Sequence, residues 1–96
     1  MSEVRKTLQF QKWLDNLKDS QAYARIKTRL FRLAIGLAGD AKPVGHGVSE
    51  LRIDYGPGYR VNFTRQGDTL ILILAGGDKS TQAKDIRNAI KLANAL

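Results

Sequence analysis

The sequence contains no cysteine, which excludes disulfide bonds and thiolate chemistry and fits a reducing compartment. It has a single histidine, His46, in a glycine-rich segment, and one histidine without cysteines or clustered acidic residues makes a poor metal site. We therefore expect His46 to be solvated, and we expect neither a metal ion nor a small-molecule cofactor. The residues present also form no Ser-His-Asp or Cys-His set of the kind used in nucleophilic catalysis.

Long apolar runs are also missing. The longest run, residues 70–75, is far too short to cross a bilayer. Residues 1–7 lack the apolar segment of a secretory signal peptide. These absences, together with the lack of cysteine, predict a soluble cytoplasmic protein.

Acidic residues are few in comparison with basic ones. The 96 residues include 16 Lys and Arg but 9 Asp and Glu, so the formal net charge is +7. Polyanions such as nucleic acid, an acidic protein or an anionic membrane are the natural partners of this charge, although solubility alone also explains it. Hydrophobic residues make up 43% of the chain and alternate with charged ones, as in a single domain spanning residues 1–96.

The N-terminal part of the chain carries two stretches with helical periodicity. Apolar residues recur three and four positions apart, which places them on one face of each helix. The first face consists of Phe10, Trp13, Leu14 and Leu17, and the second of Tyr23, Ile26, Leu30, Leu33 and Leu37. Asp19 and Ser20 offer N-cap oxygens to the second helix. Two amphipathic helices joined by a short turn predict a helical hairpin.

The rest of the chain predicts a loop, three strands and a last helix. Glycines and Pro43 make residues 36–47 a loop, after which the apolar period changes to two. The strands contain Val48, Leu51, Ile53 and Tyr55, then Tyr59, Val61 and Phe63, then the continuous run from Leu70 to Leu74. Gly76 and Gly77 end the third strand, and Ser80 or Thr81 caps a helix with the apolar face Ala83, Ile86, Ala89, Ile90 and Ala93.

The predicted fold class is α+β. An N-terminal helical hairpin packs on a small antiparallel sheet, which is a three-stranded meander with a short strand at residues 3–7 as an additional candidate, and a C-terminal helix follows. A continuous apolar strand such as the third one is typical of a strand covered on both faces.

The turn between the first two strands of the meander decides which polar residues become neighbours. A three-residue loop, 56–58, keeps both apolar sets on one face and sets Tyr55 opposite Tyr59. The opposite face then carries the pairs Asp54 with Arg60, Arg52 with Asn62, and Glu50 with Thr64. Two guanidinium groups on one small surface suit phosphate. A solvated sheet face with an ordinary Asp54–Arg60 pair explains the same pattern equally well.

The segment 76–81, Gly-Gly-Asp-Lys-Ser-Thr, follows the apolar strand and opens the last helix. Exposed amides at a helix N-terminus favour anions, and Lys79 would lie at the rim of the same sheet. The segment lacks the spacing of a phosphate-binding loop, so on this motif alone we favour a plain strand-to-helix turn. For Trp13, Tyr55 and Tyr59 we likewise favour packing in the core over stacking on bases.

Two stretches of the sequence resemble a known family. Residues 50–61, Glu-Leu-Arg-Ile-Asp-Tyr-Gly-Pro-Gly-Tyr-Arg-Val, and residues 75–82, Ala-Gly-Gly-Asp-Lys-Ser-Thr-Gln, resemble the HigB-like "addiction module killer" branch of RelE/ParE-type toxins. Residues 10–14 and 24–26 resemble it too, so the likeness covers nearly the whole chain. It implies the toxin of a type II toxin–antitoxin system that cleaves mRNA at the ribosome without a metal. In such enzymes the RNA 2′-OH attacks the adjacent phosphate and leaves a cyclic phosphate.

The resemblance implies catalytic roles for three cations. Arg60 matches the arginine of the family's Gly-Tyr-Arg strand and is expected to stabilise negative charge in the transition state. Arg52 matches a basic strand position that grips RNA. Lys79 matches the basic position after the last strand, where it holds phosphate or assists the leaving 5′-oxygen. The residues expected to contact RNA are Arg52, Arg60, Asn62, Arg65 and Lys79.

The sequence departs from the family in its proton-transfer residues. Several relatives have a tyrosine or histidine near the chain end for this purpose, and neither type follows Tyr59 here. Lys79, Asp78 and the ribosome itself are therefore the candidates for general acid and base.

The resemblance also implies partners, namely mRNA, the ribosome and a cognate antitoxin, with no membrane. The antitoxin is expected to be a small helix-turn-helix protein that covers the basic surface or displaces a helix. The helix at residues 81–96 could dock it, although we favour simple packing of that helix on the sheet. Two other functions fit the same fold: a ParE-like toxin that inhibits DNA gyrase, and a non-enzymatic basic RNA-binding module. The cluster of three cations favours the ribosome-dependent endoribonuclease.

Overall fold

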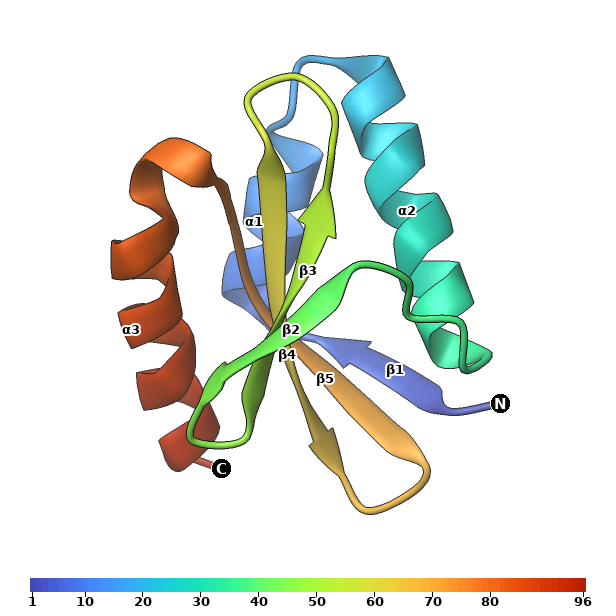
Figure 1. Cartoon of the computed structure of the whole chain (residues 1–96), viewed down its shortest axis with the longest axis vertical. Helices are drawn as coiled ribbons and strands as arrows, with labels where there is room; N and C mark the ends of the chain where they lie inside the picture. Colours follow the sequence, from blue (N-terminus) through green and yellow to red (C-terminus); the bar gives the residue numbers. More distant parts are fainter.

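Three α-helices and one five-stranded sheet make up the computed structural model, which describes residues 1–96 (Figure 1). In chain order the elements are β1 (Glu3–Lys6), α1 (Leu8–Asp15), α2 (Ser20–Ala34), β2 (Ala41–Gly45), β3 (Val48–Ile53), β4 (Tyr59–Gln66), β5 (Leu70–Asp78), a short 3-10 turn (Lys79–Thr81) and α3 (Gln82–Asn94). The predicted α+β class, the helical hairpin and the C-terminal helix are confirmed. No helix combines the length and the apolar character needed to cross a membrane.

The sheet is larger than the predicted meander, and it is mixed. Its strand order is β1-β5-β4-β3-β2, and β1 pairs in parallel with β5 while the other pairs are antiparallel. The candidate strand at the N-terminus and the antiparallel meander, now β3–β4–β5, are thus confirmed. The sheet as a whole differs from the prediction, because it has five strands and one parallel pair. The prediction of a loop over residues 36–47 is wrong in part, because the segment contains the edge strand β2. Its glycines and Pro43 are typical of a loop, so the sequence pattern did not indicate a strand. Proline is tolerated there because an edge strand leaves some of its N–H groups without a partner strand.

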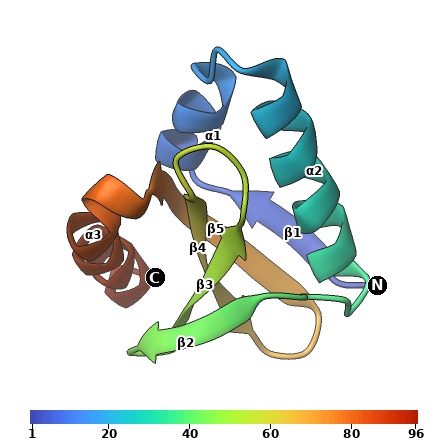
Figure 2. The ribbon, with the colours of Figure 1, turned by 45° about the horizontal axis from the view of Figure 1, so that its top comes forward.

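Helices cover both faces of the sheet (Figures 1 and 2). The main core lies under α1 and α2, where Phe10, Leu14 and Ile26 pack against strand residues such as Val61 and Ile73. A smaller core lies under α3 and consists of Val48, Leu74, Ala75 and Ala89. The strand 70–74 therefore contributes side chains to both cores, as its continuous apolar run predicts, and α3 packs on the sheet as we favoured.

Some predicted core positions are wrong. Tyr23 is 36% exposed and Leu37 is 62% exposed, because α2 turns Ala22 inward and ends at Ala34. Val48 lies in the core under α3 and not with Leu51, and Ala83 of α3 is exposed. Trp13, Tyr55 and Tyr59 are partly buried against the main core, which confirms the preference for packing.

The register of β3 and β4 differs by two residues from the predicted one. The connecting loop is residues 54–58, so Ile53 and not Tyr55 pairs with Tyr59. Arg52 lies opposite Arg60, and Glu50 opposite Asn62. Because side chains alternate with a period of two, a shift of two leaves the face of every residue unchanged. The polar face was therefore predicted correctly while the predicted pairs on it are wrong.

Gly76 and Gly77 do not end β5, which continues to Asp78. They are required because other side chains lie directly against the strand. A Cβ atom at Gly76 would overlap the indole ring of Trp13, and one at Gly77 would overlap the carboxylate of Asp85. The sequence pattern reads as a turn, but these glycines permit close packing of α1 and α3 on the sheet.

Replacing Gly76 with alanine is expected to lower the free energy of unfolding by about 1–3 kcal/mol, because the new methyl group forces the rigid indole of Trp13 out of its position. Urea denaturation measures this change. The double variant Gly76→Ala with Trp13→Phe should recover part of the loss, since the smaller ring leaves room. Wild-type stability of Gly76→Ala would contradict the close contact.

Candidate functional site

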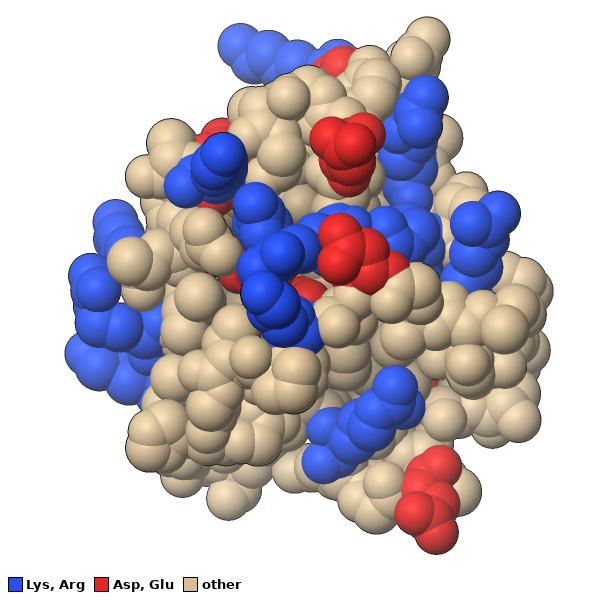
Figure 3. Space-filling model, viewed as in Figure 1, with Lys and Arg blue, Asp and Glu red and all other residues tan.

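Three basic side chains line one cavity at the edge of the sheet where β3 ends and β4 begins. Arg52 of β3, Arg60 of β4 and Lys79 of the 3-10 turn line a cavity of about 400 Å³ beside the β3–β4 loop. The other lining residues are Asp40, Ile53, Asp54, Gly56, Pro57 and Gly58. Figure 3 shows Lys and Arg side chains gathered near the middle of this face, with acidic side chains beside them. The cavity thus has the polar, cationic walls that a phosphate group requires.

A buried carboxylate holds two of these cations. The side chain of Glu50 is 1% exposed, and its Oε1 accepts hydrogen bonds from Arg60 Nη1 at 3.0 Å and from Arg52 Nε at 3.2 Å. Gln82, the first residue of α3, donates from Nε2 to both carboxylate oxygens at 3.0 and 3.1 Å. Burying a charge is unfavourable unless it is paired and hydrogen-bonded, and Glu50 meets both conditions.

The geometry leaves donors of both guanidinium groups available to a ligand. A guanidinium carries five N–H donors, and Arg60 and Arg52 each use one of these nitrogens to bind Glu50. The side chain of Arg60 is 14% exposed and that of Arg52 is 32% exposed. Each guanidinium is therefore held by Glu50 and also faces the cavity. A fixed, partly desolvated guanidinium is better suited to stabilising charge than a mobile surface arginine, because no reorganisation is needed.

Glu50 and Gln82 are site residues that the sequence prediction missed. Glu50 was paired with Thr64, and Gln82 was given no role. One signal was available, since Glu50 and Arg52 are two positions apart on one strand and must share a face. The contact with Gln82 spans 32 positions in sequence and depends on how α3 packs, which no local pattern specifies.

Asp78 and Lys79, two of the candidates for proton transfer, lie next to each other with different surroundings. Lys79 is exposed at the rim of the cavity. Asp78 caps the 3-10 turn, where hydrogen bonds from the Ser80 hydroxyl and main-chain N–H hold the pKa of its carboxyl below the usual value. A carboxylate with a lowered pKa is a weak base, so Asp78 is a poor candidate for removing a proton. Thr81 donates to Asp85 and does not cap α3 with its side chain.

Two predicted RNA-contact residues lie outside the cavity. Asn62 is fully buried, and neither atom of its side-chain amide has a hydrogen-bond partner. Arg65 is exposed near the other end of β4, with its guanidinium 5.7 Å from the centre of the Phe63 ring. Phe63 belongs to the main core, so Arg65 lies on the face opposite Arg60. The structure therefore brings together Arg52, Arg60 and Lys79, but not Asn62 or Arg65.

The remaining sequence candidates have simple places in the fold. His46 is exposed in the turn between β2 and β3, as expected, with a positive φ of 55°. No three His, Cys, Asp or Glu side chains gather in an arrangement that could hold a metal ion. The backbone amide of Ser80 binds the Asp78 carboxylate, which favours the interpretation of residues 76–81 as a strand-to-helix connection.

This chain is similar to a known protein family over most of its length. Residues 12–96 match the family described as phage-derived protein Gp49-like. A protein of Haemophilus influenzae without an assigned function is 49% identical over 94 residues, which cover 98% of this chain and 95% of that protein. The family match includes every residue that lines the cavity.

Proposed function

The chain belongs to the Gp49-like family of phage-derived proteins, which is associated with toxin–antitoxin systems, and from this premise we propose that it is a toxin that cleaves mRNA at the ribosome. The observation that carries the proposal is the cavity in which Arg52, Arg60 and Lys79 meet above a buried carboxylate. The resemblance of residues 50–61 and 75–82 to HigB-like toxins supports the same activity.

The proposed reaction is transfer of the phosphoryl group within the RNA. A bond forms between the 2′-oxygen and phosphorus while the bond from phosphorus to the 5′-oxygen breaks, leaving a 2′,3′-cyclic phosphate and a 5′-hydroxyl. Negative charge grows on the phosphate oxygens in the transition state, and the guanidinium of Arg60 is placed to stabilise it. Arg52 grips the same phosphate by charge-assisted hydrogen bonds.

We propose separate groups for the two proton transfers. Lys79, as an ammonium, donates a proton to the departing 5′-oxygen. The proton of the 2′-OH leaves to a group of the ribosome, since the pKa of Asp78 is lowered by its cap hydrogen bonds. A ribosomal base gives a physical reason for cleavage to depend on translation.

The experiment that tests this function is cell-free translation of a defined mRNA with mapping of the cleaved sites. We expect cuts within translated codons, with a 2′,3′-cyclic phosphate at the new end, and no cuts in the same RNA without ribosomes. Equal cutting of naked RNA would reject the ribosome-dependent mechanism. Inhibited supercoiling by gyrase with intact mRNA would replace the proposal with a gyrase poison, and RNA binding without products would replace it with a binding module.

We further propose that the partner of this toxin is a small helix-turn-helix antitoxin that binds the basic surface. The association of the family with toxin–antitoxin systems supports a partner of this kind. The net charge of +7 favours an acidic binding segment in it. Coexpression with the product of the neighbouring reading frame should relieve growth arrest and yield a stable complex on gel filtration.

A further inference from the structure

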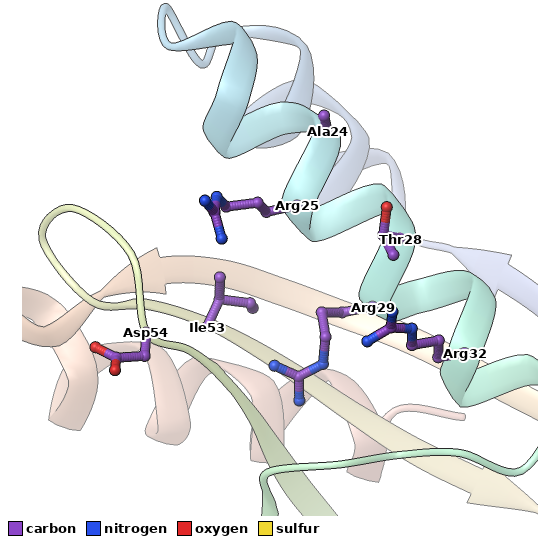
Figure 4. A pocket seen from close by; sticks show the side chains of 7 residues that line it. All are labelled: Ala24, Arg25, Thr28, Arg29, Arg32, Ile53 and Asp54. Carbon is purple, nitrogen blue, oxygen red and sulfur yellow. The ribbon is translucent and has the colours of Figure 1, made fainter.

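A second basic cavity lies beside the first one. It has a volume of about 320 Å³ and is formed between α2 and the end of β3. Arg25, Arg29 and Arg32 extend from one side of α2 toward Ile53 and Asp54 (Figure 4). Residues three and four positions apart share one side of a helix, so the three arginines form a continuous row.

The two cavities adjoin each other. Ile53, the last residue of β3, and Asp54, which follows it, line both cavities. Arg29 also links them, because its Nη1 donates to the main-chain oxygen of Arg52 at 2.6 Å. A ligand chain lying in the first cavity therefore reaches the arginine row by passing over the end of β3.

Two arginines of the row have defined contacts in the structure. Arg29 Nη2 donates to the main-chain oxygens of Ala38 at 3.1 Å and Asp40 at 3.2 Å, so this guanidinium is held by carbonyl groups and not by a carboxylate. The Arg25 guanidinium lies 4.6 Å from the centre of the Tyr55 ring, whose hydroxyl donates to Asp19 at 2.8 Å.

No carboxylate forms an ion pair with Arg25, Arg29 or Arg32, since all the salt bridges in the structure involve Arg5, Arg52 or Arg60. Asp54 alone brings negative charge to the lining of the second cavity. Three arginines against Asp54 in the lining and Asp19 beside Arg25 still leave an excess of positive charge, which attracts an anion. A nucleic acid strand suits both cavities, because its phosphates carry negative charge at regular intervals.

We propose that the cavity lined by Arg25, Arg29 and Arg32 binds phosphates of the same single RNA strand, next to the bond held at Arg52 and Arg60. This inference rests on the proposed nuclease function. It adds to the proposed active site a second RNA-binding surface formed by Arg25, Thr28, Arg29 and Arg32, which we call the track. Arg25 and Arg32 bind successive phosphate groups, Thr28 offers a hydroxyl to the sugar or phosphate, and Arg29 supplies a fixed charge. The track fixes the direction and length of the RNA that the protein holds.

The test compares RNA of two lengths that cannot be cut because 2′-O-methyl groups replace the 2′-hydroxyls. A dinucleotide spans the first cavity alone, while a dodecanucleotide reaches both. The double variant Arg25→Gln with Arg32→Gln is expected to bind the dodecanucleotide on the order of tenfold more weakly and the dinucleotide as the wild type does. The slope of log affinity against log salt should fall by about 1.4, as for two lost phosphate contacts on a single strand.

The matched control is Lys84→Gln with Arg87→Gln, which removes two charges from the exposed part of α3. This control should leave the affinity for both lengths nearly unchanged. An equal loss in the control, or no loss in the α2 variant, would overturn the track.

Failure of the track and failure of the nuclease give different results. If the α2 variant binds the dodecanucleotide weakly but the wild type cuts no mRNA in the translation extract, the track stands and the nuclease function is wrong. If mRNA is cut and the α2 variant binds both RNA lengths as the wild type does, the nuclease function stands and the track is wrong.

Discussion

Replacing Arg60 with alanine is expected to lower the rate of mRNA cleavage by about 10²–10³-fold, which is the usual effect of removing one fixed group that stabilises transition-state charge. Arg60 is held by Glu50 on one side and opens into the cavity on the other, so its charge is in place before the reaction begins. The rate is measured in a translation extract with labelled mRNA, and growth arrest on induction should disappear in parallel.

Two further variants show whether the loss comes from chemistry. Arg65→Ala removes the same type of side chain from the same strand but on the opposite face, and it should leave the rate unchanged. Arg60→Lys keeps the charge but loses the planar fork, so we expect an intermediate rate. Thermal melting followed by circular dichroism shows whether each variant is folded. Continued growth arrest by a folded Arg60→Ala protein would remove Arg60 from the mechanism.

Residue alternation along the strands is what made the cavity predictable. The parity of β3 and β4 places Arg52 and Arg60 on one face whatever the loop length, provided that the apolar residues stay together. The pairs could not be predicted, because loops of three and five residues satisfy that condition equally. Arg52 opposite Arg60 is a like-charged pair, which a local rule disfavours, and it is tolerated because Glu50 lies beneath both.

The parts of the fold that the sequence did not predict depend on contacts between distant segments. β2 contains Pro43 and Gly45 and lies between Gly39 and Gly47, so its pattern is that of a loop. Its strand geometry comes from pairing with β3. The parallel pairing of β1 with β5 joins the first and the last strand of the chain, with both helices of the hairpin and three strands between them in sequence. From the sequence, Gly76 and Gly77 predict the end of a strand. Their role in close packing becomes evident only from the positions of Trp13 and Asp85.

Glu50→Ala is expected to lower the free energy of unfolding by about 3–5 kcal/mol, a large share of the roughly 5–15 kcal/mol typical of a small domain. The variant leaves two close guanidinium groups without their shared anion and opens a cavity under α3. Glu50→Gln keeps the volume and should cost less. Urea denaturation of both variants measures the difference, and a stable Glu50→Ala protein would mean that water replaces the carboxylate.

The same residue decides whether Arg60 acts from a fixed position. If Glu50 contributes to cleavage only by orienting Arg60, then removing both side chains should slow cleavage no more than removing Arg60 alone. A double-mutant cycle with Glu50→Gln, Arg60→Ala and their combination measures this coupling, under conditions where all three proteins are folded. Independent, additive losses would show that Glu50 does not act through Arg60. Its hydrogen bond to Arg52 would then be the first alternative to examine. Strong coupling would make the buried carboxylate a positioning residue whose effect on the rate passes through one hydrogen bond of 3.0 Å.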